Sequence, residues 1–333
     1  MNASPPRVSY PGISSEAYEH PLAQAALSTV RKAKGFDLVL KKAVGTTTEA
    51  IVRMHHLASA VKVGDTQFRR LHAVMTEAVH TMDVADPPQL YVNRSVGFNA
   101  MTIGFDKPFI VLGSDLIDDM SDDEVRFVIG HELGHAMSGH ALYESLAWFL
   151  ASVGASGLSG VPGGALVVKG IELALQDWAR KSELSGDRAG LLVGQDLEVA
   201  VRTLMKLAGG KQTEEMNPRA FLEQAAEFED GTTGLRNRIV KWLMPSSDHP
   251  LLVVRAAELD RWVRDGEYGR IVHEGDYPLR GESASVSGKV IQGLNDARRR
   301  TSLDAGSGTA VGRLGRLGRQ TGARGLFDGL PKD

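Results

Sequence analysis

The spacing of apolar residues divides the chain into long helical stretches and one short strand-rich region. Apolar residues three and four positions apart predict helices over 22–34, 36–44, 46–82 with a break at Gly64-Asp65, 171–193, 196–208, 218–229 and 249–265. Short apolar runs bounded by turn residues predict strands at 90–92, 100–103 and 109–112. The last two strands are joined by a short turn, which is typical of an antiparallel hairpin. We therefore expect an α+β, mainly helical fold with a small antiparallel sheet.

A helix start follows directly after the third predicted strand. Ser121 and Glu124 have the spacing of a capping box, in which each side chain bonds the other residue's backbone N–H. The apolar spacing that follows continues to about His140. The sequence therefore predicts a well-anchored helix over 121–140, next to the sheet.

An uncharged stretch of 24 residues, 145–168, comes after this helix. A continuous helix of that length would span roughly 36 Å, enough to cross a bilayer. Pro162 and several glycines interrupt the stretch, and these residues break helices. The favoured interpretation is two short apolar helical arms around a loop, packed on the body of the protein or gating its site. A membrane-embedded hairpin is the alternative.

The amino-acid composition excludes several kinds of catalytic and metal site, but it says less about where the protein is located. The 333 residues are 42% hydrophobic and 24% charged with a net charge of −3, which is typical of a soluble globular protein and predicts no nucleic-acid partner. Cysteine is absent, so disulfides, thiolate catalysis and cysteine-ligated metals are excluded. Any metal must be held by His, Asp or Glu. Residues 1–21 suggest an extended arm without the pattern of a secretory signal, so we expect a cytoplasmic protein.

The C-terminal region 281–333 has a different composition from the rest. It holds nine Lys or Arg against five Asp or Glu, with many Gly and Ser and few large apolar residues. Glycine at every third position of 312–318 disfavours a helix. A solvated flexible tail is the favoured interpretation. The alternative is a basic element that touches a partner or an anionic membrane surface.

The candidate chemistry lies on the capped helix, in the sequence His131-Glu132-Leu133-Gly134-His135. Residues four apart share one face of a helix, so both imidazoles point to one spot. Two imidazoles on one ion suit zinc, and Glu132 lies where a general base can reach a metal-activated water. Chance produces this motif in occasional sequences of such composition. Its helical context and the lack of a competing ligand cluster favour the metal interpretation.

A catalytic zinc ion needs a third protein ligand, and Glu183 is the candidate. Glu183 and Asp187 are again four residues apart on a predicted helix. Glu183 can bind the metal while Asp187 accepts a hydrogen bond from the outer nitrogen of a ligand histidine. A surface helix with charges of both signs is the alternative, and it would be preferred if the His-Glu-x-x-His motif were absent.

Taken together, these elements resemble peptidase family M48. The resemblance rests on the His-Glu-Leu-Gly-His helix, the Glu-x-x-x-Asp element at 183–187, Asn99 to Gly104, and Ser247-Asp248-His249-Pro250 followed by Arg255; it covers about 85–255. It implies a zincin-like metallopeptidase core, with Asn99 and Ala100 bordering the substrate. It also implies that His249 faces the metal as an oxyanion-stabilising group or resting-state ligand. From the residues alone, His249 could equally begin a helix before Pro250.

The sequence thus predicts a zinc endopeptidase with one Zn²⁺ per chain, held by His131, His135 and Glu183. A protein or peptide substrate would lie extended along the strand edge at Asn99–Ile103. We expect an N-terminal helical region at 1–84, the peptidase core at 85–270 and the basic tail. A latent or inactive peptidase-like scaffold, acting as a chaperone or membrane-assembly adaptor, is the alternative. Membrane contact through 145–168 or the tail stays open.

Overall fold

The computed structural model describes residues 7–33, 35–37, 39–40, 48–104, 107–153, 164–231 and 251–281. The chain divides into two units, Met1–Gly288 and Lys289–Asp333, and all described residues lie in the first. His249, the segment 154–163 and all of the basic tail except Gly281 lie outside the described residues. The expectations for them therefore remain predictions.

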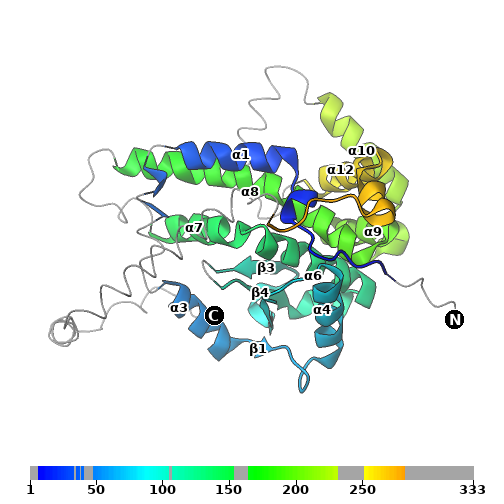
Figure 1. Cartoon of the computed structure of the whole chain (residues 1–333), viewed down its shortest axis with the longest axis horizontal. Coiled ribbons are helices and arrows are strands. Elements are labelled where there is room, and N and C mark those ends of the chain that lie inside the picture. The colour runs from blue at the N-terminus through cyan, green and yellow to red at the C-terminus, as the bar shows by residue number, and fades with distance from the viewer. Residues whose placement is uncertain are drawn as a thin grey trace. The chain divides into compact units, whose positions relative to one another are not determined.

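Helices dominate the described part of the chain (Figure 1). The longer ones are α1 (Pro21–Lys32), α3 (Thr48–Ser59), α4 (Arg69–Thr81), α6 (Asp122–Met137), α7 (His140–Val153), α8 (Gly164–Gly194), α9 (Leu197–Gly209), α10 (Pro218–Gly231) and α12 (Leu252–Arg264). Shorter turns are η1 (Ser15–Ala17), η2 (Arg94–Val96), α5 (Ser114–Asp119), η4 (Thr213–Glu215), α13 (Glu267–Gly269) and η5 (Arg270–Glu274). The expected mainly helical α+β class is confirmed.

The sheet lies beside α6, as expected, but its pairing is mixed. Its strands are β1 (Val61–Lys62), β2 (Gln89–Asn93), β3 (Ala100–Ile103) and β4 (Phe109–Gly113), in the order β1-β2-β4-β3. β3 and β4 form the predicted antiparallel hairpin, whereas β2 and β4 are parallel. The chain reverses direction twice between β2 and β4, and β4 inserts between β2 and β3. The expectation of a wholly antiparallel sheet is corrected in this respect.

Helix α6 is buried on all sides, because α4, α8, α9 and the sheet pack around it. The capping box that starts it is present, with the Ser121 N–H donating to Glu124 Oε2 at 2.8 Å. Its apolar side chains Val125, Ile129 and Leu133 are fully buried in the main core. The helix ends earlier than predicted because Gly139 takes a positive φ of 68°, and this turn starts α7 at His140.

The N-terminal segment 7–20 is part of the core. Tyr10, Ile13 and Tyr18 have no exposed surface and belong to the same apolar cluster as α6. The segment is secured to the end of the described chain, since the Ser14 N–H donates to the Pro278 carbonyl at 2.9 Å. The sequence suggested an extended arm here. The structure shows that the arm is mostly irregular, with its tyrosines and Ile13 buried.

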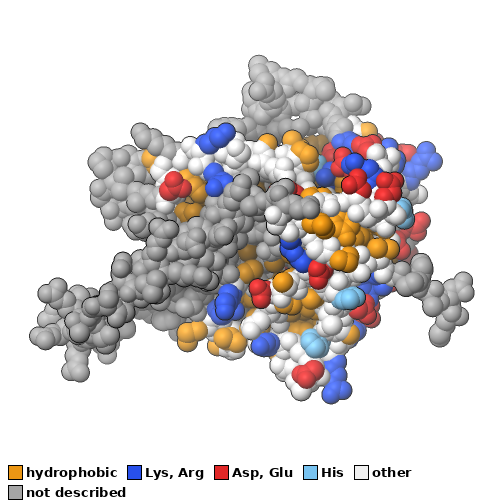
Figure 2. Space-filling view, in the orientation of Figure 1, with side chains coloured by type: hydrophobic (Ala, Val, Ile, Leu, Met, Phe, Trp, Pro, Cys, Tyr) orange, Lys and Arg blue, Asp and Glu red, His pale blue; other side chains and the backbone are white. Residues whose placement is uncertain are grey.

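Charged residues of both signs gather on the face shown in Figure 2, where α10 and α12 reach the surface. Many pair along their own helix, as Arg219 does with Glu223 and Arg264 with Asp260. Such pairs are typical of solvated helices. Among the described helices, none combines the length and the hydropathy needed to cross a membrane. The apolar stretch 145–168 contributes to α7 on one side and α8 on the other.

Candidate metal centre

Helix α6 brings His131 and His135 together, one turn apart and both buried. Their Nε2 atoms are 3.1 Å apart. This separation is shorter than the sum of two zinc–nitrogen bonds, about 4.2 Å. A single ion can therefore bind both imidazoles through Nε2, as the i and i+4 spacing predicts.

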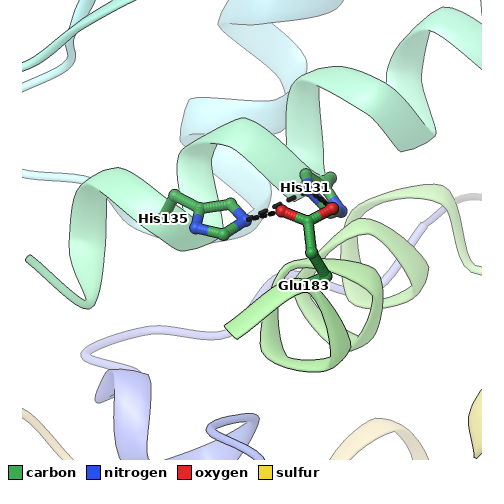
Figure 3. Close-up of side chains that lie close together, drawn as sticks. All are labelled: His131, His135 and Glu183. Atoms are coloured by element: carbon green, nitrogen blue, oxygen red, sulfur yellow. Dashed lines mark hydrogen bonds and ion pairs between the residues drawn. The ribbon is translucent and has the colours of Figure 1, made fainter. Parts of the chain in front are cut away.

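Glu183 joins the two histidines from α8 (Figure 3). Its Oε2 lies 3.7 Å from His131 Nε2, and its Oε1 lies 3.7 Å from His135 Nε2. Among the described residues, these three side chains form a group that could hold a metal ion. Two imidazole nitrogens and one carboxylate fit the ligand set of a catalytic zinc site, which keeps a position open for water or substrate.

The close approach of α8 to the two imidazoles depends on Gly186. A Cβ atom at this position would lie 2.6 Å from His131 Cε1 and 2.7 Å from His135 Nε2. Both distances are below van der Waals contact, so any larger residue would push the imidazoles aside. Gly186 therefore belongs to the site, although the sequence pattern singled out only its neighbours Glu183 and Asp187.

Asp187 lies where the sequence predicted, behind His131. Its Oδ1 is 3.1 Å from His131 Nδ1, and the guanidinium of Arg255 donates to both of its carboxylate oxygens at 2.7 and 2.6 Å. Arg255 also donates to Glu183 Oε2 at 2.6 Å. Burial acts to raise the pKa of Asp187, but Arg255 outweighs burial and lowers it. Asp187 is therefore a carboxylate and can accept a hydrogen bond from the N–H of His131 Nδ1.

His135 has different neighbours at its outer nitrogen. Glu144 Oε1 lies 2.9 Å from its Nδ1, and His140 Nδ1 lies 3.2 Å away. Burial acts to lower the pKa of His135, but the nearby carboxylates, Glu144 first, raise it to about 9. Burial, together with the adjacent His135, lowers the pKa of His140 well below its usual value. His140 is therefore neutral at pH 7.

Glu132 is buried between α6 and the sheet, and it contacts strand β3. The Thr102 hydroxyl lies 2.6 Å from Glu132 Oε2 and 3.0 Å from the Glu132 carbonyl oxygen. Burial raises the pKa of Glu132, and the charges of His131 and His135 act against that rise. A carboxyl group with a raised pKa next to a metal site is suited to accepting and returning a proton.

Comparison with known proteins agrees with this geometry. The sequence profile of Peptidase family M48 matches residues 65–263, which is more than half of the chain. The chain belongs to peptidase family M48. As a member of this family, it is a metallopeptidase with protein or peptide substrates.

A relative in the same family is the "Plastoglobule-localized metallopeptidase 48, chloroplastic" of Arabidopsis thaliana. It is 33% identical over 269 residues, which are 79% of this chain and 77% of the relative. No solved structure matches the chain significantly. The M48 match leaves most of the N-terminal region and all of the basic tail outside its range.

The residues predicted to border the substrate lie at the start of β3. Asn99 precedes the strand, and its carbonyl accepts a hydrogen bond from the Gly113 N–H at 2.8 Å. Ala100 is buried and pairs with Leu112 of β4. In the described part of the chain, no strand pairs with the other edge of β3. Thr102 connects this strand to Glu132, so the edge of β3 that has no described strand partner runs beside the candidate site.

Sequence reasoning missed the partners that come from other elements. Thr102 and Gly186 lie within the segments that resemble the family but received no role, Glu144 carried no signal, and His140 was interpreted as a helix end. Arg255 was noticed only through the family resemblance. Glu144 follows His135 by nine residues, but a turn between α6 and α7 separates them, so helical spacing could not pair them.

Proposed function

We propose that this M48 metallopeptidase is a zinc-dependent endopeptidase, with one Zn²⁺ per chain held by His131, His135 and Glu183. The observation that carries the proposal is the convergence of these three buried side chains from α6 and α8, with their nitrogen and oxygen atoms 3.1 and 3.7 Å apart. Bound zinc would supply Lewis-acid polarisation of a carbonyl and make water more acidic.

Glu132 is the proposed general base. It would accept a proton from the attacking water and deliver it to the leaving amine, which requires a carboxyl group with a pKa nearer neutrality than usual. Burial raises the pKa of Glu132, in agreement with this role. Thr102 holds one of its carboxylate oxygens and leaves the other for the proton transfer.

The proposed substrate path is the open edge of β3. An extended peptide can add to such an edge through main-chain hydrogen bonds. Asn99 and Ala100 would then border the peptide at the start of the strand. His249 keeps its proposed role near the developing negative charge, as the family resemblance implies.

Several wider expectations also remain proposals. These are the domain boundaries at 84 and 270, a cytoplasmic location and membrane contact through 145–168 or the basic tail. The alternative of an inactive scaffold has less support, because the chain retains three candidate ligands together with Glu132. A location at plastoglobules is stated in the name of the Arabidopsis relative, and it belongs to that protein.

Metal analysis and peptide cleavage test the proposal together. The purified chain should contain about one zinc ion. It should also cleave internal bonds in peptides that are blocked at both ends, which exopeptidases cannot cleave. Glu132→Gln should retain zinc and lose cleavage by about 100-fold or more, because an amide cannot accept the proton. Absence of zinc binding would overturn the metal assignment. Unchanged cleavage by Glu132→Gln would remove Glu132 from the mechanism.

A further inference from the structure

The two candidate ligand histidines need the same kind of support. When Nε2 binds a metal, Nδ1 carries the ring proton, and an acceptor there sets the tautomer and the orientation of the ring. For His131 this acceptor is Asp187, which the sequence predicted. No acceptor for His135 was predicted from the sequence.

Glu144 has the position and chemistry of that acceptor. Its Oε1 lies 2.9 Å from His135 Nδ1, which is the distance of a charge-assisted hydrogen bond. His135 is 2% exposed, whereas the Glu144 side chain is 28% exposed. The carboxylate thus reaches from a partly solvated position on α7 to an imidazole inside the core.

His140 is a second possible hydrogen-bond partner of His135 Nδ1, but an imidazole can act as either donor or acceptor there. Its Nδ1 lies 3.2 Å from His135 Nδ1, and its ring packs edge-on against Trp178. A neutral imidazole can donate or accept at either nitrogen, depending on its tautomer. A carboxylate can only accept. Only Glu144 therefore forces the proton onto His135 Nδ1 and leaves Nε2 free for a metal.

Helix α7 is held in place by contacts that do not involve Glu144. The Gly104 N–H donates to Ser145 Oγ at 3.0 Å, which joins α7 to the end of β3. Tyr143 stacks on Phe36 and packs against Trp178 of α8. Replacing Glu144 should therefore leave α7 in place, and the consequence should be confined to His135.

We propose that Glu144 is the positioning residue for His135, setting its tautomer and orientation so that Nε2 binds zinc. This inference rests on the proposed zinc site. It gives the first arm of the apolar stretch 145–168 a connection to the metal centre, because Glu144 directly precedes that stretch on α7.

The test uses zinc alone, by competition with a chelating chromophore, so that no substrate is needed. Glu144→Ala should weaken zinc binding by about 10-fold, within the usual range for such outer partners. Glu144→Gln keeps an oxygen acceptor without the charge and should weaken zinc binding less. The matched control is Glu172→Ala on α8, whose carboxylate is 21% exposed and pairs with Lys169 away from the site. This control should bind zinc like the unmodified chain.

A second measurement separates positioning from a general loss of structure. Cobalt(II)-loaded Glu144→Ala should show shifted visible absorption bands, while its far-UV circular dichroism in the metal-free state should match that of the unmodified chain. His140→Phe preserves the ring packing on Trp178 and should affect zinc affinity less than Glu144→Ala.

Three results would count against these assignments, and they differ in what they overturn. Unchanged affinity in Glu144→Ala overturns the inference. A loss confined to His140→Phe also overturns it and assigns the acceptor role to His140. Failure of the unmodified chain to bind zinc overturns the proposed function itself, which this experiment distinguishes from failure of the inference.

Discussion

The two imidazoles of the candidate metal centre are supported in different ways. The His131 support consists of Asp187 and Arg255, which are 1% and 5% exposed at their side chains and come from α8 and α12. The His135 support consists of Glu144 and His140, both on α7, with Glu144 partly open to solvent. A buried ion pair supports one imidazole, whereas a partly exposed carboxylate supports the other.

The difference follows from the cost of burying charge. An isolated buried carboxylate is unfavourable, so Asp187 needs the guanidinium of Arg255 on both of its oxygens. The Glu144 side chain is 28% exposed, so water can solvate its carboxyl group. The His131 support should therefore contribute to folding as well as to metal binding. The His135 support, which is partly open to solvent, should contribute less to folding than the His131 support does.

The largest expected effect comes from removing the imidazoles themselves. His131→Ala and His135→Ala should each abolish zinc binding at micromolar concentrations, because two remaining ligands hold zinc poorly. Equilibrium dialysis with metal analysis measures this. Full zinc occupancy in either variant would show that the replaced histidine is not a ligand. The residues that contact this histidine would then not be supports of a metal ligand.

A smaller but still large effect is expected from Gly186→Ala, which acts on both sides at once. The added Cβ would displace the two imidazoles together, and we expect zinc affinity to fall by about 100-fold. Gly170→Ala on the same helix is the matched control, since an added Cβ there meets nothing within 4 Å. The control should keep its affinity and gain up to about 1 kcal/mol of stability. Equal affinities in the two variants would contradict the close approach.

Asp187→Ala should separate the two supports most clearly. Zinc affinity should fall about 10–100-fold, and the free energy of unfolding should fall by about 3 kcal/mol because Arg255 loses its main partner. Glu144→Ala should lower affinity without a comparable loss of stability. Chelator competition and urea unfolding of the metal-free variants give both quantities. Equal stability losses would show that the two supports are energetically alike.

The smallest effect is expected at Thr102, which contacts the proposed general base Glu132 and neither of the two imidazoles. Thr102→Val removes the hydroxyl that contacts Glu132, and we expect kcat/KM to fall about 5-fold, the equivalent of one hydrogen bond. Thr102→Ser retains the hydroxyl and should retain most of the activity. Zinc affinity should be unchanged in both. A loss of zinc in Thr102→Val would place this residue with the metal supports.

The elements that the sequence predicted well are those determined by local spacing. The capping box at Ser121 and Glu124 and the strands of the hairpin follow from residues close together in the chain, and they form where predicted. The convergence of His131 with His135 also needs only one helix. Glu183 approaches both imidazoles at 3.7 Å, and its role as the third ligand stays a prediction.

Tertiary structure alone decided which partners reach the site from elsewhere. Thr102 meets Glu132 because β3 packs on α6, and Glu144 meets His135 because the turn at Gly139 folds α7 back. The burial of Tyr18 in the core likewise had no local signal. Periodicity specifies which face of a helix is apolar, but the docking of one element on another depends on the packing of all the surfaces between them. The sequence therefore predicted the candidate ligands and Asp187, whereas the packing of the assembled fold decided which other partners hold the two imidazoles in place.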